Sequence, residues 1–376
     1  MSIEHNIVVF EGDYAGPEVM REGIKVLREV EQQHGSLRLN LQYHKIGGSA
    51  YDEYGVSITK EALAAATSAD AVLLGAVGGP KWAKNKIPVE WGLGDLRKAL
   101  DAFGNLRPVH FAAPSLVELS SLKPDRCSGT DIIILRELTG GVYFGDRREH
   151  EDLDWASDTE TYARWEVERI ARLAGTLAMA SEPHRPIISL DKANVLAACG
   201  RFWRAVVTEV IAKEFPELKL EHMLIDSASM VMASNPTRLN GVILTSNMFG
   251  DIISDQASAI PGSLGLLPSA SLCAHNLRDL RGGSRVRGLY EPIHGSAPDI
   301  AGKNVVNPAG MILSVALMFR YSLNLTDAAE AIEKAVQNTL ESIVRTRDLG
   351  GNSSTSEFGD AVVAALRKSP LNGHAH

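Results

Sequence analysis

The chain has 376 residues, of which 45% are hydrophobic and 22% are charged. This length and composition are typical of a globular protein large enough for two domains, and they exclude a disordered or fibrous chain. The formal net charge of −8 gives no basic excess. Binding to nucleic acid or to an anionic membrane surface is therefore not expected.

The cysteines and the first residues bear on the compartment. Cys127, Cys199 and Cys273 are far apart and form no CxxC pair, which argues against a disulfide framework and a thiolate zinc site. The start, MSIEHNIVVFEGD, has neither a basic segment nor a long apolar run, so no signal peptide is expected. No stretch approaches the ~18 apolar residues of a membrane span. We expect a cytoplasmic protein.

Short apolar runs alternate with longer helical patterns, which predicts an α/β fold. The predicted strands are residues 7–10, 71–74, 132–135, 187–190 and 242–244. Pro17 predicts that a helix begins just after the first strand. The last third predicts helices over 310–323, 327–344 and 358–366. No strand is followed by GxGxxG and no GxxxxGK[ST] is present, so a nucleotide would bind without a Rossmann fingerprint or a P-loop.

Three aspartates are candidate metal ligands. Asp251 and Asp255 are four residues apart in SNMFGDIISDQAS, so they share one face of a predicted helix. A solvated helix face is the commoner explanation for such a pair, but the apolar flanks favour a bound Mg²⁺ or Mn²⁺. Asp226, which follows an apolar run, would be either a helix cap or a third carboxylate for the same ion.

Other side chains suggest a carboxylate substrate and acid–base chemistry. Arg97, Arg107 and Arg136 each adjoin an apolar stretch. Guanidinium groups bind carboxylates bidentately, so three converging arginines would indicate a substrate with at least two carboxylates. Singly, each is more often part of a surface ion pair. Tyr143 follows two glycines and Lys192 ends a predicted strand; each is either catalytic or structural, and spacing does not separate these alternatives.

Four long blocks carry a specific resemblance. They are RELTGGVYFG, DKANVL, LNGVILTSNMFGDIISDQASAIPGSLGLLPSASL and GLYEPIHGSAPDIAGK. They resemble the isocitrate/isopropylmalate dehydrogenase family and, within it, the 3-isopropylmalate dehydrogenases, over about residues 7–366. The resemblance implies a two-domain α/β fold without a Rossmann fingerprint. Residues 1–104 and 263–376 would form a cofactor-binding domain containing both termini, and residues 105–262 a central domain for substrate, metal and dimerisation.

The resemblance also implies an active site shared within a homodimer. Arg97, Arg107 and Arg136 would hold the malate carboxylates. Asp251 and Asp255, together with Asp226 of the partner subunit, would bind Mg²⁺ or Mn²⁺. Lys192, also of the partner subunit, would help deprotonate the C2 hydroxyl, and Tyr143 would protonate the carbanion left by decarboxylation.

In the same resemblance NAD would lie along one glycine-containing turn. Its residues would be His294, Gly295, Ser296, Ala297, Pro298 and Asp299, with Asn307 nearby. The Asp299 carboxylate would accept hydrogen bonds from the adenosine ribose and repel a 2′-phosphate. That arrangement favours NAD over NADP, as the acidic residue of a Rossmann fold does.

The implied reaction is oxidative decarboxylation of a 3-substituted malate, in the simplest case of 3-isopropylmalate to 2-oxo-4-methylpentanoate in leucine biosynthesis. The substrate segment departs from the family pattern Pro-Glu-Gln-Gly-Leu-Leu. Glu90 and Leu93 match it, and Val195, a further isopropyl contact, is present, but Gly94 replaces a leucine that contacts the isopropyl group.

The Gly94 departure leaves the substrate open. A bulkier substituent, as in 3-benzylmalate from specialised metabolism, would fill the space of the missing leucine. Alternatively, Trp91 or Tyr14 fills it and the substrate is 3-isopropylmalate. A non-catalytic regulatory subunit is a third interpretation, which the presence of every expected catalytic and metal residue opposes.

Overall fold

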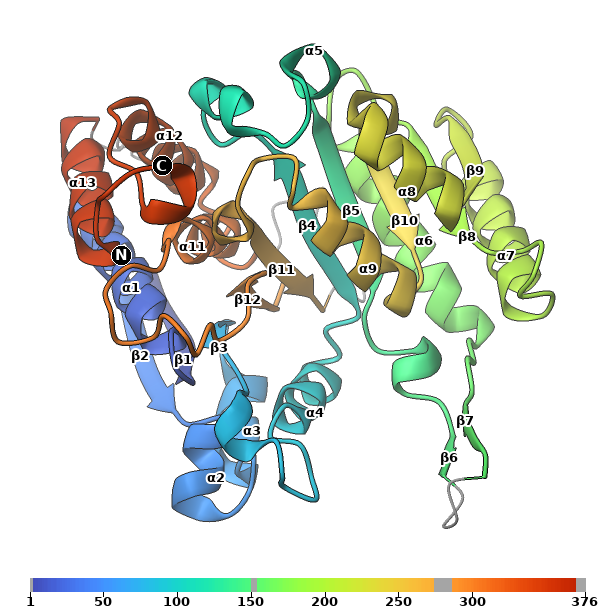
Figure 1. Ribbon diagram of the computed structural model, residues 1–376, viewed down its shortest axis with the longest axis horizontal. Helices are drawn as coiled ribbons and strands as arrows, with labels where there is room; N and C mark the ends of the chain where they lie inside the picture. The colour runs from blue at the N-terminus through green and yellow to red at the C-terminus, as the bar shows by residue number, and fades with distance from the viewer. Residues whose placement is uncertain (1–2, 150–153, 274–285, 370–376) are drawn as a thin grey trace.

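The computed structural model describes residues 3–149, 154–273 and 286–369. Within them, helices pack on both faces of a ten-stranded sheet (Figure 1). The strands, in their order across the sheet, are β2 (Leu37–His44), β1 (Ile3–Gly12), β3 (Ala71–Ala76), β12 (Gly288–Pro292), β11 (Pro268–Leu272), β4 (Gly104–His110), β5 (Asp131–Glu137), β10 (Gly241–Thr245), β8 (Ile187–Asp191) and β9 (Leu220–Leu224). The predicted α/β fold and all five predicted strands are confirmed.

The centre of the sheet is antiparallel. β11 pairs antiparallel with β12 and with β4, and β4 pairs antiparallel with β5. The two outer groups, β2-β1-β3-β12 and β5-β10-β8-β9, are parallel within themselves and run in opposite directions. The sequence analysis missed β4 and β11, because GNLRPVH and PSASL contain the residues that strands generally disfavour.

The two expected chain portions supply the two sides of this sheet. Residues 1–104 and 263–376 provide β2-β1-β3-β12-β11, and residues 105–262 provide nearly all of β4-β5-β10-β8-β9. Hydrogen bonds between β11 and β4 make the sheet continuous across the boundary. A division into two domains therefore stays a prediction.

Successive residues of β1 are buried on opposite faces of the sheet, against different helices. Ile7 and Val9 pack in the cluster that contains α1 (Gly16–His34) and α11 (Ala309–Tyr321), whereas Val8 and Phe10 pack with α3 (Lys60–Ser68) and α4 (Trp91–Leu100). The period of two in a strand produces this two-sided burial. The remaining α-helices are α2 (Gly48–Tyr54), α5 (Pro124–Cys127), α6 (Arg164–Met179), α7 (Cys199–Glu214), α8 (Ile225–Ser234), α9 (Asn247–Ala257), α12 (Thr326–Glu341) and α13 (Thr355–Lys368).

The predicted helices are confirmed, with small shifts of their ends. Pro17 lies in the first turn of α1, and the three C-terminal helices are α11, α12 and α13. No helix in the described part of the chain is long and apolar enough to cross a bilayer.

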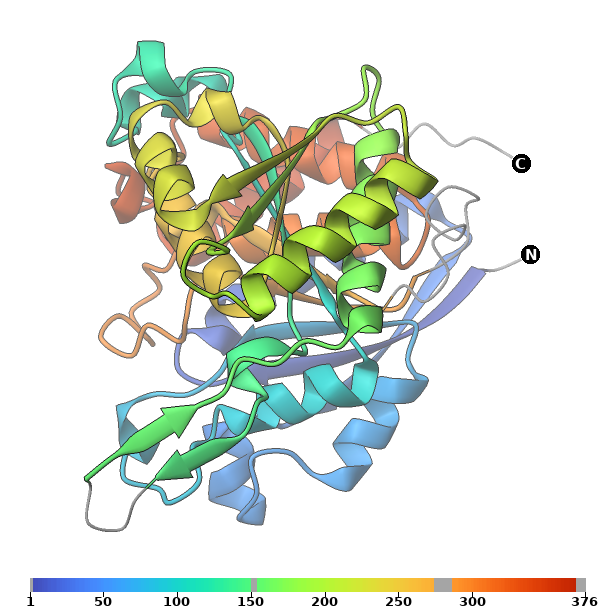
Figure 2. The same ribbon diagram turned by 90° about the vertical axis from the view of Figure 1, so that its right-hand side faces the viewer.

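One hairpin stands apart from the main sheet. β6 (Arg147–Glu149) and β7 (Ala156–Asp158) pair only with each other, and Figure 2 shows this green arm extending away from the body of the molecule. The arm follows the 3₁₀ turn Gly141–Tyr143, so the base of the arm places Tyr143.

Candidate active site

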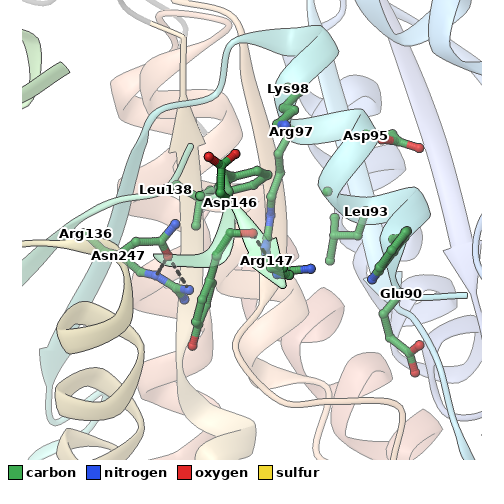
Figure 3. Close-up of a pocket in the computed structure, with 15 residues that line it drawn as sticks. Glu90, Leu93, Asp95, Arg97, Lys98, Arg136, Leu138, Asp146, Arg147 and Asn247 are labelled. Carbon is green, nitrogen blue, oxygen red and sulfur yellow. Dashed lines mark hydrogen bonds between the residues drawn. The ribbon is translucent and has the colours of Figure 1, made fainter. Parts of the chain in front are cut away.

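A cavity of about 600 Å³ lies between helix α4 and the segment that leads into the arm (Figure 3). Its lining includes Glu90, Leu93, Gly94 and Arg97 on one side, and Arg136, Leu138, Tyr143, Phe144 and Asn247 on the other. Several substrate residues expected from the sequence thus meet in one space. Arg107 and Val195 do not line it.

Arg136 is the most constrained of the three arginines. Its side chain is only 3% exposed, and its Nε and Nη2 donate to Asn247 Oδ1 over 3.0 and 2.8 Å. Nη1 donates to Asp251 Oδ1. Burial, aided by the charge of nearby Arg107, lowers the pKa of Arg136 to about 10, so the group stays protonated at neutral pH. A cation this buried requires an anionic partner.

Arg107 reaches the same helix from β4. Its Nη1 donates to Ser254 Oγ over 2.6 Å and to Asp255 Oδ1 over 3.2 Å, and its Nε donates to Asn105 Oδ1 over 2.8 Å. Burial lowers its pKa from the ordinary arginine value. The positive charges of Arg107 and Arg136 therefore neutralise the negative charges of Asp251 and Asp255 on α9.

Arg97 has a buried donor with no partner. Its Nη2 pairs with Glu291 Oε1 at 2.8 Å, while Nε finds no hydrogen-bond acceptor among the described residues. Buried donors are normally satisfied, so a missing partner at a cavity wall suits a ligand oxygen. A role for Arg97 in holding a substrate carboxylate stays a prediction.

Tyr143 contacts α9 directly. Its hydroxyl donates to Asp251 Oδ2 over 3.0 Å. Burial raises the pKa of Tyr143, and the negative charge of Asp251 raises it further. The phenol is therefore protonated at neutral pH and is suited to give a proton away.

Lys192 and Asp226 form a separate pair. Lys192 Nζ lies 2.6 Å from Asp226 Oδ1, and this hydrogen bond lowers the pKa of the carboxyl. Neither residue lines the cavity beside Tyr143. Within the described ranges, no three His, Cys, Asp or Glu side chains gather to hold a metal ion. Within one chain, the predicted ligand Asp226 therefore does not join Asp251 and Asp255 in such a group.

The predicted cofactor turn follows β12 and is tied to the β1 loop by a hydrogen bond from Ala15 N to Ser296 O of 2.9 Å. His294 Nε2 is buried and has no partner in the described part of the chain, and the space beside Gly295 is open. Burial lowers the pKa of His294, so its ring is neutral at neutral pH. An orphaned ring nitrogen beside open space fits a bound dinucleotide.

The other two cofactor residues differ in their surroundings. Asp299 is exposed and its carboxylate is accessible to a ribose. Asn307 is buried, and its amide already donates to Asp348 Oδ2 at 2.9 Å and accepts from Ala309 N at 3.0 Å. These two bonds leave the amide one N–H and one oxygen lone pair, so a contact from Asn307 to NAD would require access to a buried side chain and no exchange of partners.

A family model described as isocitrate/isopropylmalate dehydrogenase matches residues 6–362. The chain belongs to this family. A 3-isopropylmalate dehydrogenase of Alternaria alternata is 69% identical over 367 residues, covering 97% of this chain and 98% of that protein. A 3-isopropylmalate dehydrogenase of Neurospora crassa is 58% identical over 366 residues, with 97% and 98% covered.

Solved structures agree with the family. The isocitrate dehydrogenase of Methylococcus capsulatus has a TM-score of 0.83 at 28% identity, covering 96% of this chain and 99% of that one. A β-decarboxylating dehydrogenase of Thermococcus kodakarensis has a TM-score of 0.76 at 33% identity, with 97% and 96% covered. This member of the family is therefore a decarboxylating dehydrogenase. The alternative of a non-catalytic regulatory subunit is rejected.

The sequence analysis missed the polar residues that hold the arginines. Asn105 and Asn247 each accept from a buried guanidinium, and Ser254 accepts from Arg107. Only their positions could have indicated a role in the site. Each of the three lies beside apolar sequence and within four residues of a predicted site residue. Spacing alone did not distinguish them from ordinary cap residues.

Metal binding at α9 predicts a stability difference. Mg²⁺ or Mn²⁺ at about 100 times its Kd should stabilise the wild-type protein by about 2.7 kcal/mol relative to EDTA. Asp251→Asn should lose most of that difference, because one of the two charged ligands is gone. Thermal unfolding with metal and with EDTA measures it. The control is Asp360→Asn. Asp360 is an exposed carboxylate on α13 that pairs with Lys25, and its loss should keep the full stability difference. An undiminished metal effect in Asp251→Asn would contradict the site.

Proposed function

We propose that this dehydrogenase oxidises the C2 hydroxyl of a 3-substituted malate with NAD and releases the C3 carboxylate as CO₂. The observation that carries the proposal is the contact of one carboxylate, Asp251, with both Arg136 and Tyr143. It brings a carboxylate-binding cation, a metal ligand and a proton donor within one hydrogen-bond network at the cavity.

The residues divide the chemistry between them. NAD⁺ held along the turn from His294 to Asp299 would supply the hydride acceptor for C2. A Mg²⁺ or Mn²⁺ ion held by Asp251 and Asp255 would supply positive charge for an oxyanion at C2. Lys192 of the partner subunit, acting as a neutral amine, takes the proton of the C2 hydroxyl. The bond from C3 to its carboxylate then breaks, and Tyr143 gives C3 a proton. Arg97, Arg107 and Arg136 orient the substrate carboxylates throughout.

The site is completed by a second copy of the chain. Three apolar side chains near Lys192 and on α8 and α9 are largely exposed: Val195 at 66%, Met230 at 68% and Ile252 at 59%. The two helices lie side by side (Figure 1). Exposed apolar side chains gathered in one region are characteristic of a protein interface. A homodimer through this face would bring Lys192 and Asp226 of the partner subunit toward Asp251 and Asp255.

The shared site predicts complementation between two inactive variants. Tyr143→Phe and Lys192→Ala should each be nearly inactive as homodimers. If subunits exchange at random, half the dimers are mixed and one of their two sites is intact, so about a quarter of wild-type activity should return. Mixing two preparations of Tyr143→Phe is the control and should restore nothing. Failure to regain activity despite demonstrated subunit exchange would place each site within one chain.

Asp299 supports NAD over NADP, because its exposed carboxylate would repel a 2′-phosphate. The proposed function is tested with purified protein, Mn²⁺ and a panel of 3-substituted malates, each assayed with both cofactors. kcat/KM with NAD should exceed that with NADP by at least about tenfold, equivalent to about 1.4 kcal/mol. Turnover of isocitrate alone, or equal use of NADP, would contradict the proposal. Unsubstituted malate serves as the reference substrate.

Two substituents remain candidates. The relatives named 3-isopropylmalate dehydrogenase support the isopropyl group, and with it a place in leucine biosynthesis. The cavity supports a bulkier group, because a Cβ atom added at Gly94 would meet no atom within 4 Å. Tyr14 does not fill this space, since its ring packs edge-on against Trp82 with 5.7 Å between centroids. Trp91 also leaves it open and is 52% exposed.

Gly94→Leu separates the two substituents. The added side chain should lower kcat/KM for 3-benzylmalate by about 100-fold, because it fills the open space. It should raise kcat/KM for 3-isopropylmalate by about tenfold, since one or two additional buried methylenes each contribute about 0.8 kcal/mol. Unsubstituted malate should be affected least. If 3-benzylmalate is not a substrate and Gly94→Leu leaves 3-isopropylmalate kinetics unchanged, the enlarged pocket is wrong.

A further inference from the structure

Asn247 occupies the point where three parts of the site meet. It is fully buried at the start of α9, four residues before Asp251. Its Oδ1 accepts two hydrogen bonds from Arg136, drawn as dashed lines in Figure 3. Its Nδ2 donates to Gly140 O over 2.9 Å, and its backbone N donates to the Tyr162 hydroxyl over 2.9 Å.

Chemistry fixes which way the amide points. A guanidinium only donates and a backbone carbonyl only accepts, so the oxygen must face Arg136 and the nitrogen must face Gly140. A primary amide carries an acceptor at one end and a donor at the other without charge. The two ends of one amide therefore connect the arginine to the turn that carries Tyr143.

The oxygen end of the Asn247 amide does not occupy all the N–H donors of the Arg136 guanidinium. Of its five N–H groups, Asn247 takes two and Asp251 takes one. Among the described residues this leaves two N–H groups for a substrate carboxylate. By holding one edge of the guanidinium plane, Asn247 fixes the direction in which the remaining donors point.

The Gly140 end fixes the turn before Tyr143. Gly141 has φ of 71°, and a side chain there would meet the Tyr162 hydroxyl at 2.4 Å. Gly140 N also donates to Glu137 Oε2 over 2.8 Å. The backbone of the turn is therefore held by hydrogen bonds on both sides. The bond from Asn247 ties this backbone to Arg136, while Asp251 ties the Tyr143 hydroxyl to the same guanidinium.

We propose that Asn247 is a positioning residue that sets the Tyr143 hydroxyl relative to a substrate held by Arg136, so that proton delivery to C3 depends on its amide nitrogen. The proposal rests on the proposed function for the roles of Arg136 and Tyr143. Its own content is that the two ends of the amide act separately, the oxygen on substrate orientation and the nitrogen on the proton donor.

Asn105 provides a matched control. Its Oδ1 accepts from Arg107 Nε over 2.8 Å, and its Nδ2 donates to Ser271 Oγ over 2.9 Å. It is buried and holds a site arginine as Asn247 does, yet it has no contact with the Tyr143 turn in the described structure. A substitution there disturbs arginine orientation without disturbing the proton donor.

The test compares Asn247→Asp with Asn105→Asp and Tyr143→Phe by stopped-flow measurement of NADH, on the substrate that the wild-type enzyme turns over best. Asn247→Asp keeps an acceptor for Arg136 but turns an oxygen toward Gly140 O. We expect a rapid first turnover of NADH followed by a steady-state rate about 100-fold below wild type, as misplaced groups typically produce. Tyr143→Phe should give the same pattern. Asn105→Asp should raise KM without enlarging the ratio of first-turnover to steady-state rate.

Parallel loss of the first turnover and the steady-state rate in Asn247→Asp would overturn the proposal, and so would a wild-type kcat. Thermal unfolding and NADH binding establish that each variant is folded. If Asn247→Asp does not fold, Asn247→Ser is measured in the same way and judged by the same ratio. Failure of the proposed function is distinguishable, because the wild-type enzyme itself would then form no NADH from any 3-substituted malate.

Discussion

The bond between the Arg136 guanidinium and the Asp251 carboxylate is the interaction on which the site depends. A guanidinium that is 3% exposed is stable only with a counter-charge and satisfied donors. Asp251 supplies the charge and Asn247 supplies the acceptor. Because Asp251 also accepts a hydrogen bond from Tyr143, the requirement to neutralise one buried cation brings α9 and Tyr143 together.

The antiparallel centre of the sheet is what makes this possible. In the β4–β5 register Asn105 lies opposite Arg136, and Arg107 is two residues further along the same face. Both arginines therefore point toward α9, where Asp251 and Asp255 are one turn apart.

Some features of the fold and the site could be predicted from the sequence, and others could not. Apolar runs predicted five strands correctly, and the four-residue spacing correctly placed Asp251 and Asp255 on one helix face, because both features are local. Convergence of Arg97 and Arg136 on one cavity was expected only from the resemblance. Asn105, Asn247 and Ser254, which accept hydrogen bonds from Arg107 and Arg136, were not predicted. The sequence does not show which residue an amide or hydroxyl will contact, because that neighbour lies far away along the chain.

The sequence by itself determined the α/β class, the family and the residue types of the site, because helix and strand periods and long motifs are written along the chain. Only the tertiary structure decided that β4 and β11 turn the sheet antiparallel, that Tyr14 packs on Trp82, and that the space beside Gly94 stays open. These depend on which surfaces meet at long range, and side-chain packing there is set by volume and hydrogen bonding rather than by local sequence.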